Sequence, residues 1–332
     1  MRIVIGERLR PFSHLPGVRC ILPYSGKIVQ IFPTRLRIGE QEILLPIQGP
    51  VRPFTIELDL EKGKIVVFGT ACKESFRYQI VQQKEKIEIR CDKGKFCFSL
   101  DSKAVMEPLP CERLSLGSHK QLDWELVLRR KELSELFPAL FRLGQLIPAV
   151  VESTRPGTAA LLTQCAVRIA TGDKPGLQAA FIDLWEAAFE GILAPRLVDE
   201  QFQGIVPAEP LSSITSPLIL VQEAALLVRS LFIQEEGIVL SLLPSLPPEL
   251  FFGKLCNVQT AYAACDLEWS KKLLRLCIIR PHQDAEITLK LQRSLKRFRK
   301  RTSPKGRGEM VDVNTPLQLK AGVPLYLDRF EK

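Results

Sequence analysis

The hydrophobic periodicity of this chain changes twice along its length, and the order of the changes restricts the folds it can adopt. Residues 1–105 contain segments that alternate apolar and polar side chains, as half-buried strands do, among them TIELDL (55–60) and KIEIRC (86–91). Residues 131–234 carry apolar side chains at helical spacing, and alternation returns from Gly237 onward. This β–α–β order predicts separate antiparallel sheet regions on either side of a helical block, rather than a parallel α/β sheet.

Three domains follow from these changes. We predict an N-terminal antiparallel β-sandwich over 1–115, a short helical block over 116–236 and a small C-terminal β-domain over 237–332. The strands TIELDL and KIEIRC are each followed by a turn with glycine at its third position, which suits a hairpin that needs a positive φ there. Near the end of the chain, LQLKAGVPLYL (317–327) predicts a closing hairpin around its Ala-Gly pair.

Apolar spacing, prolines and glycines predict four helices in the middle of the chain. They cover about 131–152, 158–171, 175–194 and 217–234. Pro138 is a predicted kink or break in the first helix, because proline removes a backbone hydrogen bond. Gly172 is predicted to end the second helix, and Pro175 lies at a favoured first-turn position of the third.

The positive charge of the chain is concentrated in one segment. The sequence has 46 Lys and Arg residues against 37 Asp and Glu residues, a formal net charge of +9. Residues 290–307 contain nine basic residues and no acidic one, so the rest of the chain (46 − 9 = 37 basic residues) is balanced. We interpret 290–307 either as a solvated basic loop between two strands or as a surface for an anionic partner, such as nucleic acid, a membrane face or an acidic protein. The residues proposed for such contacts are Arg297, Arg299, Lys300 and Arg301.

Cysteine and histidine usage bears on compartment and cofactors. Nine cysteines without C-x-x-C spacing predict reduced thiols, and therefore a cytoplasmic location. The histidines His14, His119 and His282 are far apart and lack metal-ligand spacing, so no metal is predicted. The sequence has neither G-x-G-x-x-G nor G-x-x-x-x-G-K, so no nucleotide cofactor is predicted. No apolar run is long enough to predict a signal peptide or a transmembrane helix.

Acidic residues on and after the third predicted helix are the candidates for catalysis. Asp183, Glu186 and Glu190 recur at spacings of three and four, which places them on one side of a helix. They are interpreted either as an acidic site or as a solvated face, since the apolar residues of this segment lie on the opposite side. Asp199 and Glu200 follow the helix and are candidate partners for Glu186 or Glu190 in a two-carboxylate mechanism.

Arg155 lies in the turn Arg-Pro-Gly-Thr (155–158), between two predicted helices. Its guanidinium is a candidate for binding a ligand carboxylate or sugar hydroxyl. The alternative is that Arg155 stabilises the joint by binding helix-end carbonyls, while the proline and glycine set the backbone.

This turn belongs to one of two segments that carry a family resemblance. FRLGQLIPAVVESTRPGT (141–158) pairs a glycine-interrupted helix with the Arg-Pro-Gly-Thr turn. Residues 237–280 contain the run LLPSLP, then Gly253, then the strand DLEW. In order and in frame, these motifs resemble glycoside hydrolase family 95, the α-L-fucosidase-like enzymes, and the similarity covers 141–158 and 220–327.

The resemblance implies a β-sandwich, an (α/α)6 toroid that holds the active site, and a small β-domain. It also implies inverting hydrolysis between a carboxylic acid and a carboxylate base. The chain departs from this pattern, because only three helices are predicted between 158 and 237, where a toroid needs twelve. Residues 216–220, SPLIL, also lack a carboxylate where the family has its catalytic aspartate. We therefore expect a truncated relative whose helical block is the remnant of a toroid.

Three functions remain open from the sequence. The first is a non-catalytic glycoside-hydrolase-like protein with a binding or structural role linked to carbohydrate. The second is an active hydrolase of O-glycosyl bonds, of fucosidase or galactosidase type, with relocated carboxylates. The third is an interaction protein that binds anionic partners through residues 290–307.

Overall fold

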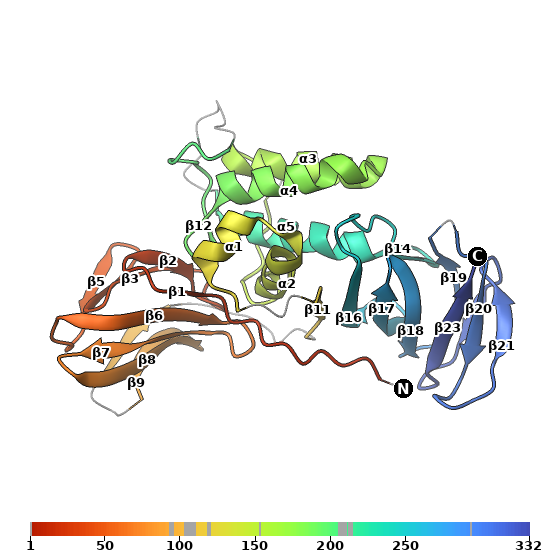
Figure 1. The fold of residues 1–332 in the computed structure, drawn as a ribbon, viewed down its shortest axis with the longest axis horizontal. Helices are drawn as coiled ribbons and strands as arrows, with labels where there is room; N and C mark the ends of the chain where they lie inside the picture. Colours follow the sequence, from red (N-terminus) through yellow and green to blue (C-terminus); the bar gives the residue numbers. More distant parts are fainter. Residues whose placement is uncertain are drawn as a thin grey trace.

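The structure is a computed structural model with antiparallel sheets at both ends and a helical block between them (Figure 1). The described residues include five α-helices, and the predicted order of sheets, helices and sheets is confirmed. Described are residues 2–92, 96–102, 111–117, 121–152, 154–204, 211, 215–292 and 294–332. The second predicted glycine turn (93–95), His119 and Arg293 lie outside these residues.

The N-terminal region consists of two antiparallel sheets that share one apolar core. The six-stranded sheet has the order β1 (Phe12–Ser13), β6 (Val51–Asp59), β7 (Lys64–Ala71), β8 (Glu74–Gln83), β9 (Lys86–Cys91), β10 (Cys97–Asp101). The four-stranded sheet has the order β2 (Val18–Ile21), β3 (Ile28–Ile31), β4 (Arg35–Ile38), β5 (Gln41–Leu44). The alternation predicted for β6 holds only in part. Ile56 and Leu58 are fully buried and Glu57 between them is not, but Thr55 and Asp59 are buried as well. Gly63 has φ +61° in the turn between β6 and β7, which confirms that hairpin.

Most helices of the helical block begin and end close to the residues predicted from the sequence. Its helices are α1 (Trp124–Arg130), α2 (Leu133–Gly144), α3 (Ala160–Thr171), α4 (Lys174–Ala188) and α5 (Leu218–Phe232), with the short 3-10 helix η1 (Gly157–Ala159) before α3. Gly172 ends α3 with φ +68°, and Pro175 lies in the first turn of α4, as predicted. Pro138 was predicted to kink or break the first helix, and it does not break it, since α2 continues through it. Burial of neighbours such as Phe137 and Leu140 offsets the lost backbone hydrogen bond.

The third predicted helix is shorter than expected. Helix α4 ends at Ala188 and not near residue 194, because β12 (Phe189–Glu190) turns back to pair with β13 (Ala194–Pro195). Glu190 is therefore on an extended segment and does not share a helix face with Glu186.

The C-terminal region also contains two sheets. The larger, seven-stranded sheet has the order β11 (Arg113–Ser115), β16 (Phe252–Gln259), β17 (Ala263–Ser270), β18 (Leu273–Pro281), β23 (Leu325–Glu331), β20 (Arg297–Arg301), β21 (Glu309–Asp312). The smaller sheet has the order β14 (Ile233–Glu236), β15 (Val239–Leu242), β19 (Ala285–Lys290), β22 (Leu317–Leu319). Its β15–β19 pair is parallel, whereas the other pairs among the described strands are antiparallel. Strand β11 joins the C-terminal sheet, although it lies within the residues predicted for the N-terminal domain.

Two predictions for the C-terminal region are wrong. The closing hairpin does not form, since β22 pairs with β19 while β23 pairs with β18 and β20 in the other sheet. The basic segment is not a continuous loop, because its central residues form β20. Phe298 is fully buried in β20, and this burial explains why a highly charged sequence nevertheless forms a strand.

The apolar core is continuous from the N-terminal sheets through the helices to the C-terminal sheets. Contacts join α2 to β11 and β13 to β2, so strands of both sheet regions pack against the helical block. In Figure 1, β12 and α1 lie on the side of the helical block that faces β2. This junction carries three of the five acidic candidates, Glu186, Glu190 and Glu200.

Candidate ligand cleft

A cleft of about 820 Å³ lies where β2 and β3 meet the end of α1, the end of α4 and the loop 196–204. We call it the junction cleft. Its polar lining consists of Arg19, Gln30, Arg129, Lys131, Glu186, Glu190, Glu200, Gln201 and Gln203. A volume of this size lies within the range of small-molecule sites, roughly 300–1,000 Å³. The cleft brings together three of the five predicted acidic candidates.

A glycine places Glu190 beside strand β2. Gly191 has φ +48°, and a Cβ atom at this position would lie 2.1 Å from the carbonyl oxygen of Arg19. The following N–H, that of Ile192, donates to the same oxygen at 2.8 Å. Only glycine allows the chain to turn here while touching the backbone of β2. The turn therefore fixes where Glu190 enters the junction cleft.

Two ion pairs join charged residues of the cleft lining. The Nη1 group of Arg19 lies 2.7 Å from Oε1 of Glu190, and Lys131 pairs with Glu186. They connect β2 to β12 and the end of α1 to α4. The arginine and lysine side chains are 48% and 42% exposed, so each pair contributes at most about 1 kcal/mol to stability. Their main effect is to orient charged groups along the cleft wall.

Arg129 and Glu200 complete the charged lining. Both are exposed, and neither has an ion-pair partner within the described part of the chain. Among the described residues, the lining therefore contains three cations and three carboxylates. Four of the six are paired with one another, which leaves one cation and one carboxylate for a ligand.

The loop that carries Glu200 is held by a buried ion pair. Arg196 donates from Nη2 to Oδ1 of Asp199 at 2.8 Å, and the other carboxylate oxygen accepts the N–H of Gly204 at 2.8 Å. Arg196 also donates to the carbonyls of Glu186 and Ala187, at 3.0 and 3.1 Å, and so satisfies the last turn of α4. Asp199 is 1% exposed. This candidate for catalysis is therefore a buried support of the cleft wall and does not line the cleft.

Asp183 lies on another side of α4. Its side chain is half-buried and close enough to α3 to act on Cys165. Burial raises the pKa of the Cys165 thiol to about 12, and the negative charge of Asp183 adds to this increase. Asp183 does not line the junction cleft, so the predicted acidic face is divided by the fold.

Within the described residues, Arg155 contacts side chains at the joint and not the helix-end carbonyls that were expected. Its Nη1 group donates to Oγ1 of Thr163 at 3.1 Å, and its Nη2 group pairs with Glu223 at 2.6 Å. These partners belong to α3 and α5, so Arg155 connects two helices.

The rest of the Arg-Pro-Gly-Thr turn contacts the loop behind the cleft. Thr158 is fully buried and donates from Oγ1 to the carbonyl of Arg196 at 2.6 Å. A Cβ atom on Gly157, which has φ +60°, would lie 2.2 Å from the carbonyl of Leu197. The turn thus holds the start of the loop 196–204, on which Glu200 lies.

The cationic and amide side chains of the cleft were not predicted. Arg19 lies on β2, and its partner Glu190 is 171 residues away in the sequence, so no local pattern connects them. Trp185 is 4% exposed, stacks on Phe189 with ring centroids 4.8 Å apart and also lines the cleft.

The four cations predicted to bind an anionic partner are all paired with carboxylates. Arg299 donates to Asp328 at 2.8 Å, Arg301 pairs with the same carboxylate, Lys300 lies 2.7 Å from Glu309, and Arg297 lies 4.0 Å from Asp312. Burial raises the pKa of Asp328, but the two guanidinium groups lower it by more, so this pKa is below its usual value. Within the described residues, the acidic strands β21 and β23 therefore neutralise much of the basic segment.

Neither the structure nor the comparisons add a cofactor or a family. Within the described residues, no cluster of three or more His, Cys, Asp or Glu side chains is placed to hold a metal ion. No helix in this part of the chain is long and apolar enough to cross a membrane. No protein-family model matches the chain, and the search of curated proteins finds no match.

Proposed function

We propose that the junction cleft binds a neutral carbohydrate and that the chain does not hydrolyse it. The observation that carries the proposal is the balanced lining of three cations and three carboxylates, with glutamine amides between them. A cleft for a phosphate or a polycation would carry an excess of one sign of charge. Balanced charge favours a ligand that is uncharged and polar.

Sugar hydroxyls match the hydrogen-bonding groups of this lining. Each hydroxyl both donates and accepts, guanidinium and ammonium groups only donate, and carboxylates only accept. Gln30 and Gln201 add amides that do both. Arg129 and Glu200, without ion-pair partners among the described residues, are the side chains most available to a ligand.

The positions of the carboxylates argue against hydrolysis. An inverting or retaining glycosidase needs two carboxyl groups across the scissile bond, about 5–9.5 Å apart, one of which must deliver a proton. Glu186 and Glu190 each face a cation in an ion pair, and Asp199 is buried with both oxygens bonded. Only Glu200 remains among the four, and a single carboxylate does not make the acid–base pair.

The resemblance to glycoside hydrolase family 95 supports a carbohydrate as the ligand and is part of the same proposal. The order of sheets, helices and sheets agrees with that family's domain order, and the Arg-Pro-Gly-Thr turn keeps a structural role. Between residues 158 and 237 the described chain contains only α3, α4 and α5. These are too few for a toroid, so we propose a truncated, non-hydrolytic relative.

A glycan array of neutral and acidic saccharides tests the binding. We expect neutral oligosaccharides to bind, and we expect Arg129→Ala and Glu200→Gln each to weaken binding about tenfold, because each removes one charged hydrogen bond. The matched controls are Arg275→Ala and Glu249→Gln, exposed residues that lie outside the cleft. No saccharide binding, or binding that the controls weaken as much as the cleft variants, would overturn the proposal.

Aryl glycosides test the absence of hydrolysis separately. We expect no release of p-nitrophenol from fucosides, galactosides or glucosides. Release that disappears in Glu186→Gln or Glu190→Gln would show instead that these carboxylates are catalytic.

A further inference from the structure

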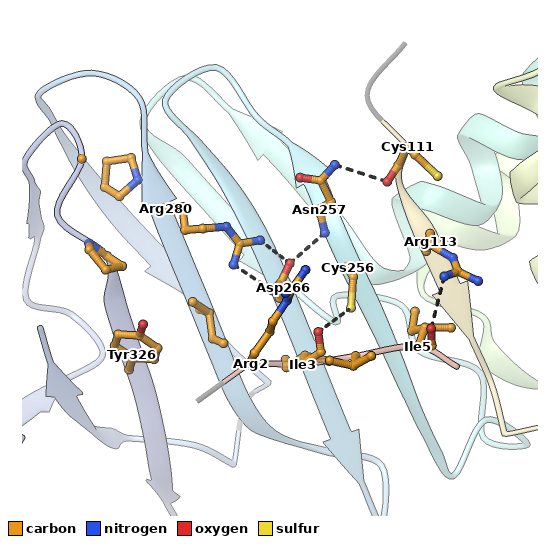
Figure 2. A pocket seen from close by; sticks show the side chains of 15 residues that line it. Arg2, Ile3, Ile5, Cys111, Arg113, Cys256, Asn257, Asp266, Arg280 and Tyr326 are labelled. Atoms are coloured by element: carbon orange, nitrogen blue, oxygen red, sulfur yellow. Dashed lines mark hydrogen bonds and ion pairs between the residues drawn. The ribbon is translucent and has the colours of Figure 1, made fainter. Parts of the chain in front are cut away.

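A second groove, of about 900 Å³, crosses one face of the seven-stranded C-terminal sheet (Figure 2). We call it the sheet groove. Residues 2–5 lie across strands β16 to β18 and form one wall, with Ile3 packed on Ile278 and Tyr326. Side chains fix this segment, since Arg113 donates from Nη1 to the carbonyl of Ile5 at 3.1 Å.

An arginine is held in a fixed orientation inside the sheet groove. Arg280 donates from Nη1 and Nη2 to the two oxygens of Asp266, at 2.8 and 2.5 Å. Asp266 is 3% exposed and also accepts the N–H of Asn257 at 2.8 Å. Asn257 has φ +60° at an irregularity in the β16–β17 pairing, which turns its N–H toward the carboxylate. Both oxygens of Asp266 are therefore used to position Arg280.

The positioned guanidinium keeps hydrogen-bonding capacity for a ligand. A guanidinium has five N–H donors, and the two bonds to Asp266 leave three. The Arg280 side chain is 40% exposed and lines the groove. Figure 2 shows the Arg2 side chain rising from the N-terminal segment toward Asp266 and Arg280. Arg2 is exposed and has no ion-pair partner among the residues that the structure describes.

The lining of the sheet groove is cationic, unlike that of the junction cleft. It contains Arg2, Arg113 and Arg280 but, in the described chain, only one carboxylate, that of Asp266. Arg113 pairs with Glu61, which lies outside the lining, and Arg280 pairs with Asp266, so the unpaired positive charge of the lining is that of Arg2. Beside these charges lie apolar surfaces of Ile278, Pro324 and Tyr326.

We propose that the sheet groove binds a small anion, a phosphate or carboxylate group attached to an apolar body. The anionic group contacts Arg280 and Arg2, and the apolar body lies on Ile278 and Tyr326. Planar guanidinium groups bind both kinds of oxyanion through two parallel hydrogen bonds. The cost of ordering Arg280 is already met by Asp266 in the free protein, which favours binding.

The test is calorimetric titration of the full chain with phenyl phosphate, benzoate and the neutral benzyl alcohol. We expect at least one of the two anions to bind and benzyl alcohol not to bind, and the preferred anion identifies the headgroup. Arg280→Lys keeps the charge but loses the planar fork, so it should weaken binding about tenfold. Arg2→Gln should weaken it as well, and this substitution at an exposed residue leaves the sheet intact.

Arg275→Lys is the matched control. It lies on the same strand, β18, is exposed and does not line the sheet groove. Two results would overturn the proposal: no binding of either anion, or binding that Arg280→Lys and Arg275→Lys affect equally. In the second case, the Arg280–Asp266 pair would only connect β17 to β18.

Discussion

Replacing Asp199 with alanine tests whether a buried ion pair builds the wall of the junction cleft. Asp199→Ala removes the acceptors of Arg196 Nη2 and of the Gly204 N–H, both 2.8 Å away. It leaves the Arg196 guanidinium, 9% exposed, without its counter-charge. Removing one partner of a buried pair costs about 3–5 kcal/mol, because the remaining charge stays desolvated. The loss of stability should be largest in the loop 196–204 and in the last turn of α4, because Arg196 binds two carbonyls of that turn.

Amide hydrogen exchange measures this local cost. A loss of about 3 kcal/mol corresponds to exchange more than about 100-fold faster, since each 1.4 kcal/mol is a factor of ten. We expect this acceleration at the C-terminal end of α4 and at Gly204. Asp199→Asn should have a smaller effect, because its amide oxygen still accepts one bond.

Glu200→Ala is the control for the same loop. Glu200 is exposed, so its removal should change the free energy of unfolding by no more than about 0.5 kcal/mol. The reasoning is refuted if Asp199→Ala accelerates exchange no more than Glu200→Ala does.

Two further predictions concern the other structural claims. Asp328→Asn removes an acceptor shared by two arginines and should cost about 2 kcal/mol in urea unfolding at pH 7. Because the pKa of Asp328 is lowered in the folded state, its stabilisation is present above about pH 4 and is lost as the pH falls through the folded value. The variant should therefore lose less stability than the wild type between pH 5 and pH 3, and equal losses would contradict the assignment. Gly191→Ala should destabilise the chain by more than Gly172→Ala in the same assay. Both residues have positive φ, but only Gly191 abuts a carbonyl, that of Arg19, whereas a Cβ on Gly172 meets open space. Equal costs would show that the contact with β2 is not tight.

Local patterns in the sequence were sufficient to predict much of the fold. Alternation of apolar and polar residues identified strands such as β6, because the apolar residues of one face, Ile56 and Leu58, are buried in the core. Gly63, Gly172 and Pro175 marked real boundaries, because the backbone conformations at turns and helix ends are local properties.

Features that depend on distant partners could not be predicted in this way. The end of α4 is set by β12 pairing with β13 and by the contact of Gly191 with β2, which no periodicity in 175–194 reveals. From the sequence alone, the basic segment is interpreted as solvated. Its counter-charge, Asp328, lies 29 residues after Arg299 and comes beside it only in the folded chain. For the same reason, only some of the residues that line the junction cleft were predicted as candidates. Its acidic residues are close in sequence, whereas Arg19 comes from another sheet.

The most direct test of the central claim, that the junction cleft binds the saccharide, is hydrogen exchange of the full chain with and without the best neutral saccharide from the array. We expect slower exchange in residues 17–19, 186–191 and 200–204, the segments that carry most of the cleft lining. We expect no change in residues 256–259, which border the sheet groove. Protection confined to 256–259, or unchanged exchange at the cleft under saturating saccharide, would contradict the claim.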